Sequence, residues 1–291
     1  MTRHPLFGLG LAILGALILT PDTLLMRWAD MDGFQMLAWR GLLSGSVFLS
    51  LWAITRRGYL TTDISNLKSP FGAGLIVCQF FNATLFSLGI SIAPVSLVLF
   101  GIATVPVFSA LFAFLILREA TGLATWMTII TVLAGIALAL FSDGNGQYEI
   151  ELWSFLGAIA GLGVALCLAL SFVLIRHKRN SPFLLAIGIG GLLSGTTGFL
   201  VTGVENMTAG NLEYIIITGA MILPFSFFLL SFAARHTHAS NVSLALLLET
   251  VLGPVWVWSG TSEQPTEMMF IGGFIVVASL ITYLIYMKRR M

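Results

Sequence analysis

Apolar runs of about 20 residues recur along almost the whole chain, separated by short polar segments. A helix needs about 20 apolar residues to cross the roughly 30 Å hydrocarbon core of a bilayer, since each residue adds about 1.5 Å. Runs of this length predict ten membrane-spanning helices at residues 6–29, 34–54, 71–90, 94–116, 122–141, 153–175, 182–203, 212–232, 240–259 and 268–287. Residues 71–117 carry no charge and are too long for one crossing, so Ile92-Ala93-Pro94 is expected to form a turn between two spans.

Basic residues gather on one side of this predicted topology. If the N-terminus lies inside, twelve of the fourteen Lys and Arg residues fall in cytoplasmic segments, whereas the outer loops carry acidic charges and no basic ones. The twelve are Arg3, Arg56, Arg57, Lys68, Arg118, Arg176, Lys178, Arg179, Arg235, Lys288, Arg289 and Arg290. Because cytoplasmic loops of membrane proteins are enriched in Lys and Arg, the pattern predicts a multi-pass inner (plasma) membrane protein with both termini in the cytoplasm.

The longest outer connection, at residues 142–152, divides the ten predicted spans into five and five. Because five is odd, the two halves must cross the membrane in opposite directions. The fourth span contains VSLVLFGIATVPV and the ninth VSLALLLETVLGPV, which share V-S-L-x-L and a later Pro-Val. We therefore expect an all-α integral membrane protein of two inverted five-helix repeats, residues 1–145 and 146–291.

The composition agrees with a membrane protein: 57% of the residues are hydrophobic, 9% are charged and the mean hydropathy is +0.97. Soluble domains carry about 25% charged residues. Cys78 and Cys167 both lie inside apolar runs, where thiols behave as small hydrophobic groups, so we expect neither a disulfide nor a metal site. The glycine-rich residues 188–195 lie in a span and lack the context of a phosphate loop, which disfavours an ATP-driven pump. No enzyme signature, cofactor or nucleic-acid partner is expected.

Two stretches carry a resemblance to a known family: RWADMDGFQMLAWRG at residues 27–41 and LLLETVLGPVWVWSGTSEQPTEMMFIGGFIVVAS at residues 246–279. They resemble the EamA family of the drug/metabolite transporter (DMT) superfamily, and the resemblance covers essentially the whole chain. The family's second-half pattern is matched at Glu249, Pro254, Glu263, Pro265 and Gly272-Gly273. In the first half, Ala120 and Thr121 follow Glu119 where a Glu-x-Pro would be expected. The resemblance implies a ten-span inverted repeat that transports amino acids, other metabolites, drugs or sugar-linked nucleotides.

Glu249 is a single carboxylate at the middle of the ninth span. A charge at the bilayer centre costs about 2.5 to 3.5 kcal/mol on insertion scales, so this side chain must face protein or water. Ser243, Leu246, Glu249, Thr250 and Gly253 form a small and polar stripe at helical spacing, which could line a central cavity. Glu249 is either a partner for protons or a substrate amine, or a protonated group that bonds a neighbouring helix.

Asp22 and Arg40 form a second pair of candidate residues. The first helical hairpin turns near residue 31, and the two residues stand nine positions before and nine after it, at matching depth. An ion pair is therefore expected, either to fix the hairpin or to bind a substrate carboxylate through Arg40. Pro21 predicts a kink beside Asp22, since proline cannot donate a backbone hydrogen bond.

Gln79 and Asn82 lie three residues apart on one face of the third span. Their amides can bond a polar ligand or a neighbouring helix. Together with Glu249, Asp22, Arg40, Ser243 and Thr250 they form the predicted substrate-binding and coupling set.

The function predicted is secondary-active transport by alternating access, with export of amino acids or related small metabolites. The alternative is a proton-coupled transporter of cationic drugs or quaternary amines, favoured by the acidic residues and the many aromatic ones. The expected partners are a small-molecule substrate, the lipid bilayer and protons, and the expected state is a monomer or a homodimer.

Overall fold

A computed structural model describes residues 5–119, 122–140, 152–178 and 180–261, and, further on, residues 271–272, 274–275, 278–279, 281–283 and 285–286. Most of the predicted outer connection at 142–152 and the basic residues at 3, 179 and 288–290 lie outside this described part. The same holds for Glu263 and Pro265 of the family pattern.

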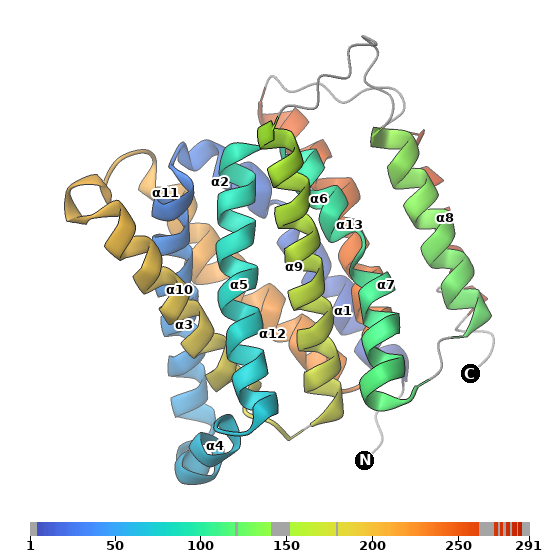
Figure 1. The fold of residues 1–291 in the computed structure, drawn as a ribbon, viewed down its shortest axis with the longest axis horizontal. Coiled ribbons are helices and arrows are strands. Elements are labelled where there is room, and N and C mark those ends of the chain that lie inside the picture. The colour runs from blue at the N-terminus through green and yellow to red at the C-terminus, as the bar shows by residue number, and fades with distance from the viewer. Residues whose placement is uncertain are drawn as a thin grey trace.

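The described residues form a bundle of helices (Figure 1). The α-helices are α1 Pro5–Leu19, α2 Asp22–Ala29, α3 Gly33–Thr55, α4 Leu60–Leu67, α5 Pro70–Ile92, α6 Val95–Ile102, α7 Val105–Phe112, α8 Leu123–Leu140, α9 Leu152–His177, α10 Phe183–Thr202, α11 Leu212–Ile217, α12 Leu223–Ala234 and α13 Ala239–Gly260. Short 3₁₀ turns (η1 Arg57–Tyr59, η3 Val204–Asn206) and π-helical segments (η2 Ala113–Leu117, η4 Thr218–Ile222) join some of them.

Eight helical stretches in the described residues are long and apolar enough to cross a membrane. They are Phe7–Ala29, Gly33–Thr55, Pro70–Ile92, Val95–Leu117, Phe155–His177, Phe183–Thr202, Leu212–Ala234 and Ala239–Gly260. These stretches coincide with the predicted spans one to four and six to nine. Helix α8 lies at the fifth predicted span, and the tenth falls in the partly described residues 271–286. The chain is therefore an all-helical, multi-pass membrane protein in its described part.

Interruptions of the spans occur where prolines remove backbone donors. Helix α1 ends at Leu19, and Pro21 precedes α2, which confirms the expected kink. The turn expected at residues 92–94 is also confirmed, because α5 ends at Ile92 and α6 begins at Val95. The break in the first span makes Asp22 the first residue of α2, near the partial positive charge of a helix N-terminus.

Contacts between the ends of spans show which of these ends lie on the same side of the bundle. At one end of the bundle, Glu119 accepts from Arg176 at 3.3 Å and pairs with His238 at 3.0 Å. At the other end, the backbone N–H of Asn211 donates to Ala29 at 2.8 Å and Trp28 Nε1 donates to the carbonyl of Gly260 at 3.0 Å. The segments that follow spans four, six and eight thus meet at one end, and those that follow spans one, seven and nine meet at the other.

Helices α3 and α10 cross at a patch of glycines. A Cβ atom on Gly41 would lie 2.5 Å from the Cα of Gly195, and one on Gly45 would lie 2.7 Å from the backbone nitrogen of Leu192. Close approach through small residues is how helices associate in lipid, where apolar burial gives little driving force.

We expect Gly195→Ala to destabilise this crossing, because the new methyl group would meet backbone atoms of Gly41 and Leu42 that cannot move aside. Overpacking of this kind costs about 1 to 3 kcal/mol. The control is Gly10→Ala, since a Cβ at Gly10 meets nothing within 4 Å. The folded, monodisperse fraction and the thermal midpoint in detergent should fall for the first variant and stay near wild type for the second. Equal behaviour of the two variants would contradict a tight crossing.

Candidate functional site

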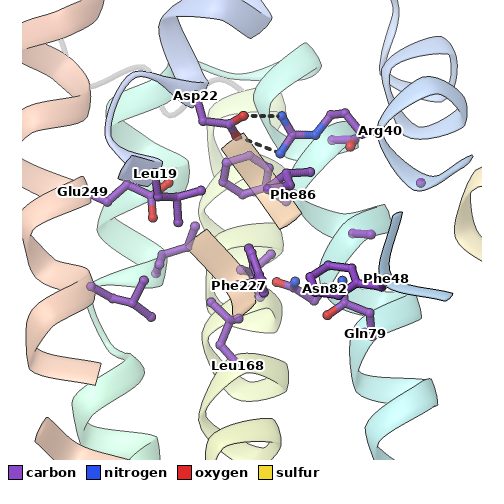
Figure 2. A pocket seen from close by; sticks show the side chains of 17 residues that line it. Leu19, Asp22, Arg40, Phe48, Gln79, Asn82, Phe86, Leu168, Phe227 and Glu249 are labelled. Carbon is purple, nitrogen blue, oxygen red and sulfur yellow. Dashed lines mark hydrogen bonds and ion pairs between the residues drawn. The ribbon is translucent and has the colours of Figure 1, made fainter. Parts of the chain in front are cut away.

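A cavity lies inside the bundle, where α1, α2, α3, α5, α6, α9, α12 and α13 meet (Figure 2). Its lining residues are Leu19, Asp22, Arg40, Gly41, Phe48, Gln79, Asn82, Ala83, Phe86, Ser87, Ile102, Val164, Leu168, Leu223, Phe227, Leu246 and Glu249. We call it the central cavity. Its wall is mostly apolar, with a few polar groups directed into one space, which is the usual composition of a small-molecule site.

The ion pair predicted between Asp22 and Arg40 is present on the wall of the central cavity. Arg40 Nη1 donates to Asp22 Oδ1 at 2.8 Å and Nη2 donates to Oδ2 at 2.7 Å. Asp22 is fully buried and Arg40 is 5% exposed. The guanidinium also lies over the ring of Phe86, 5.4 Å from its centroid. Both charges are therefore satisfied by a two-bond contact that fixes the hairpin of α2 and α3.

Glu249 reaches the central cavity from α13, on the side away from Arg40 in Figure 2. The residue is 4% exposed, and Asp22 and Arg40 lie within electrostatic range of it. Within the described part of the chain, no hydrogen bond or ion pair to its carboxylate is present. Glu249 thus differs from Asp22. The carboxylate of Asp22 is paired with Arg40, whereas Glu249 is a buried acid beside the central cavity without a partner among the described residues.

Gln79 and Asn82 line the central cavity from α5 and are labelled side by side in Figure 2. Asn82 is 6% exposed and Gln79 is half-buried. Gly190 of α10 packs closely behind Gln79, since a Cβ there would lie 2.7 Å from the Cβ of Gln79. Both side chains line the cavity, where each amide can donate and accept hydrogen bonds.

Ser243 and Thr250 are buried but do not belong to the cavity lining. The hydroxyl of Ser243 is hydrogen-bonded to Ser109 of α7 and donates to the carbonyl of Ala239 at 2.9 Å. The hydroxyl of Thr250 has no partner among the described residues. Of the stripe expected on this helix, Leu246 and Glu249 face the cavity, whereas Ser243 contacts the neighbouring helix.

Phe48 and Ser87 line the central cavity but are absent from the predicted set. Both could have been found by extending the helical spacing of the predicted residues. Phe48 stands eight positions after Arg40 on α3, and Ser87 eight positions after Gln79 on α5, so each lies close to the same helix face as its predicted neighbour.

Comparison with known proteins agrees with the architecture and with the family resemblance. Residues 6–141 match the EamA-like transporter family. The "Uncharacterized transporter YdfC" of Bacillus subtilis (strain 168) is 26% identical over 267 residues, which cover 88% of this chain and 84% of that protein. A solved crystal structure matches with a TM-score of 0.75 at 15% identity, over 98% of this chain and 97% of its own. The last similarity concerns the fold alone.

Proposed function

We propose that this chain, whose residues 6–141 match the EamA-like transporter family, is a secondary-active transporter and that the central cavity is its substrate-binding site. The observation that carries the proposal is Glu249, a buried acid facing that cavity across from a neutralised ion pair. Burial of an unpaired carboxylate in a membrane is costly, so such a group persists where it has a use. Its partner would be one that arrives and leaves, namely a proton or a substrate amine.

The substrate we propose is an amino acid or a related small metabolite with an amine. Its ammonium group would pair with Glu249, and its carboxylate or amide would bond Gln79 and Asn82 on the facing helix. The guanidinium of Arg40 already binds both carboxylate oxygens of Asp22. In this proposal Arg40 therefore orients Asp22 and does not bind the carboxylate of the substrate. Export is the proposed direction.

A cationic drug or quaternary amine is the second candidate, because three aromatic rings also line the central cavity. These are Phe48, Phe86 and Phe227. A desolvated cation over an aromatic face gains about 2 kcal/mol or more. Phe86 already lies against Arg40, which leaves two rings for such a ligand.

Alternating access would come from two inverted repeats, residues 1–145 and 146–291. Support comes from the crossing of α3 and α10, where Arg40-Gly-Leu-Leu-Ser-Gly45 of one half and Gly190-Gly-Leu-Leu-Ser-Gly195 of the other meet. A Cβ on Gly45 would meet the backbone nitrogen of Leu192, and one on Gly195 would meet that of Leu42. These two contacts exchange when the halves are exchanged, as a two-fold axis between repeats requires.

The pairing of the other helices supports the same relation. Helix α5 packs on α9, and α12 packs on α1, so the third span contacts the sixth as the eighth contacts the first. Ile102 and Glu249 stand at equivalent places, six residues after the V-S-L serines, and both line the central cavity. The site would therefore lie between the repeats, where rocking of one half against the other opens it to either side.

We propose that the protein lies in an inner (plasma) membrane with both termini in the cytoplasm. The proposed coupling ion is the proton, and the proposed working unit is a monomer or a homodimer. The support for this orientation is that five basic residues lie in connections or last helical turns at the end of the bundle expected to face the cytoplasm, namely Arg56, Arg118, Arg176, Lys178 and Arg235. A reporter that is active only in the cytoplasm should be active when it is fused after Met291. Activity of a reporter that works only outside the cytoplasm would contradict the proposed orientation.

A counterflow screen in proteoliposomes tests the function. Vesicles preloaded with amino acids, quaternary amines or nucleotides should show saturable exchange with the amino acids and weaker exchange with the amines. Exchange restricted to quaternary amines would favour the second candidate. No exchange with any class across pH 6 to 8 would contradict the proposed substrates.

A further inference from the structure

A second cavity, of about 500 Å³, lies at one end of the bundle, where α9 ends and α5 and α10 begin. Buried Leu75 and Ala186 form its floor, and exposed His177, Lys178 and Asn180 stand at its rim. We call it the basic cavity. It is separate from the central cavity, although Leu75 of the one and Gln79 of the other are one turn apart on α5.

The lining of the basic cavity includes Arg176, His177 and Lys178 and no acidic residue in the described part of the chain. Arg176 contacts Glu119 at 3.3 Å, and that carboxylate is shared with His238. The ammonium of Lys178 lies 4.7 Å from the ring centroid of Phe71 and pairs with no carboxylate among the described residues. The cavity therefore carries positive charge that its own wall does not neutralise.

Two side-chain polar atoms at the basic cavity also lack a hydrogen-bond partner among the described residues. Arg176 Nε and Ser181 Oγ are buried and lack a hydrogen-bond partner in the described structure. Phe71 holds the neighbouring basic residues in place, because the ring of His177 stacks on it at 4.8 Å. An oxygen-rich anion, which brings several acceptors and a negative charge, matches this wall better than a neutral solute.

The place of the basic cavity points to the membrane surface. The spans Pro70–Ile92 and Phe183–Thr202 begin beside it, and Phe155–His177 ends there. On α5, the exposed residues Ala73, Val77 and Phe81 follow each other at four-residue spacing on the side of the helix opposite to Phe71 and Leu75, which line the cavity. Val77 is 51% exposed and Phe81 48%, so α5 presents apolar surface to the bilayer close to the cavity.

We propose that the basic cavity binds the phosphate of an anionic phospholipid, whose acyl chains extend into the bilayer around the bundle. Basic pockets between helices at the inner surface of membranes bind lipid head groups through charge. The phosphate would pair with Lys178 and accept hydrogen bonds from Ser181 and Asn180. This site is independent of the transport function proposed for the central cavity.

Native mass spectrometry of the full-length protein in detergent, titrated with phosphatidylglycerol or phosphatidylcholine, tests the proposal. The wild type should retain phosphatidylglycerol in preference. Lys178→Gln should weaken that retention about fivefold, since each basic residue near an anionic surface contributes on the order of 1 kcal/mol. Lys178 is exposed, so the variant should fold.

The control is Arg118→Gln, which also removes one positive charge from an exposed residue, and neither Arg118 nor its chain neighbours line the basic cavity. Its effect should stay below about twofold. Equal retention of the two lipids, or equal losses in both variants, would overturn the proposal. Displacement of phosphatidylglycerol by millimolar inorganic phosphate would assign the cavity to free phosphate instead of a lipid.

Discussion

Glu249→Gln is expected to leave the protein folded and to reduce transport by about tenfold to a hundredfold. The amide keeps the shape and hydrogen-bonding capacity of the side chain but cannot bind or release a proton or carry a negative charge. A hydrogen bond to a charged group contributes about 1.5 to 3 kcal/mol, which corresponds to this range in affinity. The remaining transport should also lose its dependence on pH, because Glu249 would be the titrating group in the cavity.

Proteoliposome exchange at pH 6, 7 and 8 measures this effect, with size-exclusion chromatography as the check on folding. Glu205→Gln is the control, since Glu205 is an exposed acid outside the central cavity. The control should transport at the wild-type rate. A Glu249→Gln protein with the wild-type rate and pH profile would show that Glu249 is a structural, protonated side chain and would sink the site assignment.

Removal of one member of the Asp22–Arg40 pair is expected to lower stability more than removal of both. Either Asp22→Asn or Arg40→Gln strands a buried charge, and breaking a buried pair costs about 3 to 5 kcal/mol. The double variant leaves two neutral groups that can still hydrogen-bond. The folded yield and thermal midpoint should therefore recover in the double variant, which gives a large coupling energy in the double-mutant cycle.

Substrate exchange by the double variant distinguishes a structural role of this pair from a role in substrate recognition. A double variant that folds but no longer exchanges substrate would mean that the pair orients substrate as well as the hairpin. Additive losses of stability in the cycle would contradict the two-bond contact between the side chains.

Proline positions and distances along the first hairpin were enough to predict the breaks in the helices and the contact of Asp22 with Arg40. The turn at residues 92–94 and the kink at Pro21 follow from proline chemistry that acts within a few residues. The contact of Asp22 with Arg40 followed from equal distances to the turn of a hairpin, because adjacent antiparallel helices rise by the same amount per residue.

The rotation of α13 about its axis could not be predicted in full from the sequence. Helical spacing shows that Ser243, Glu249 and Thr250 share a broad face, but packing against α7 decides which part of that face meets the cavity. The G-L-L-S-G sequence at residues 41–45 recurs at residues 191–195 and is a longer uninterrupted repeat than the V-S-L-x-L motif. The repeat supports two related halves only because its two copies meet at the crossing of α3 and α10. The spacing of the copies along the chain does not show this contact.

The basic cavity could not be predicted either, because it joins the ends of α4, α5, α9 and α10, whose lining residues extend from Asn66 to Ala186 along the chain. Each of Arg176, His177 and Lys178 fits the ordinary enrichment of basic residues at one membrane surface. Only the packing of α5 beside α9 and α10 gathers them around one space with Ser181 and Asn180.

Accessibility of the central cavity from the two sides of the membrane tests the central claim most directly. Ala83→Cys, placed on the cavity wall in a protein whose Cys78 and Cys167 are replaced by Ala, would be treated with a membrane-impermeant thiol reagent from each side of oriented vesicles. We predict labelling from both sides, with protection by the substrate that the exchange screen identifies. Labelling from one side alone under every condition, unaffected by that substrate, would contradict an alternately exposed binding site.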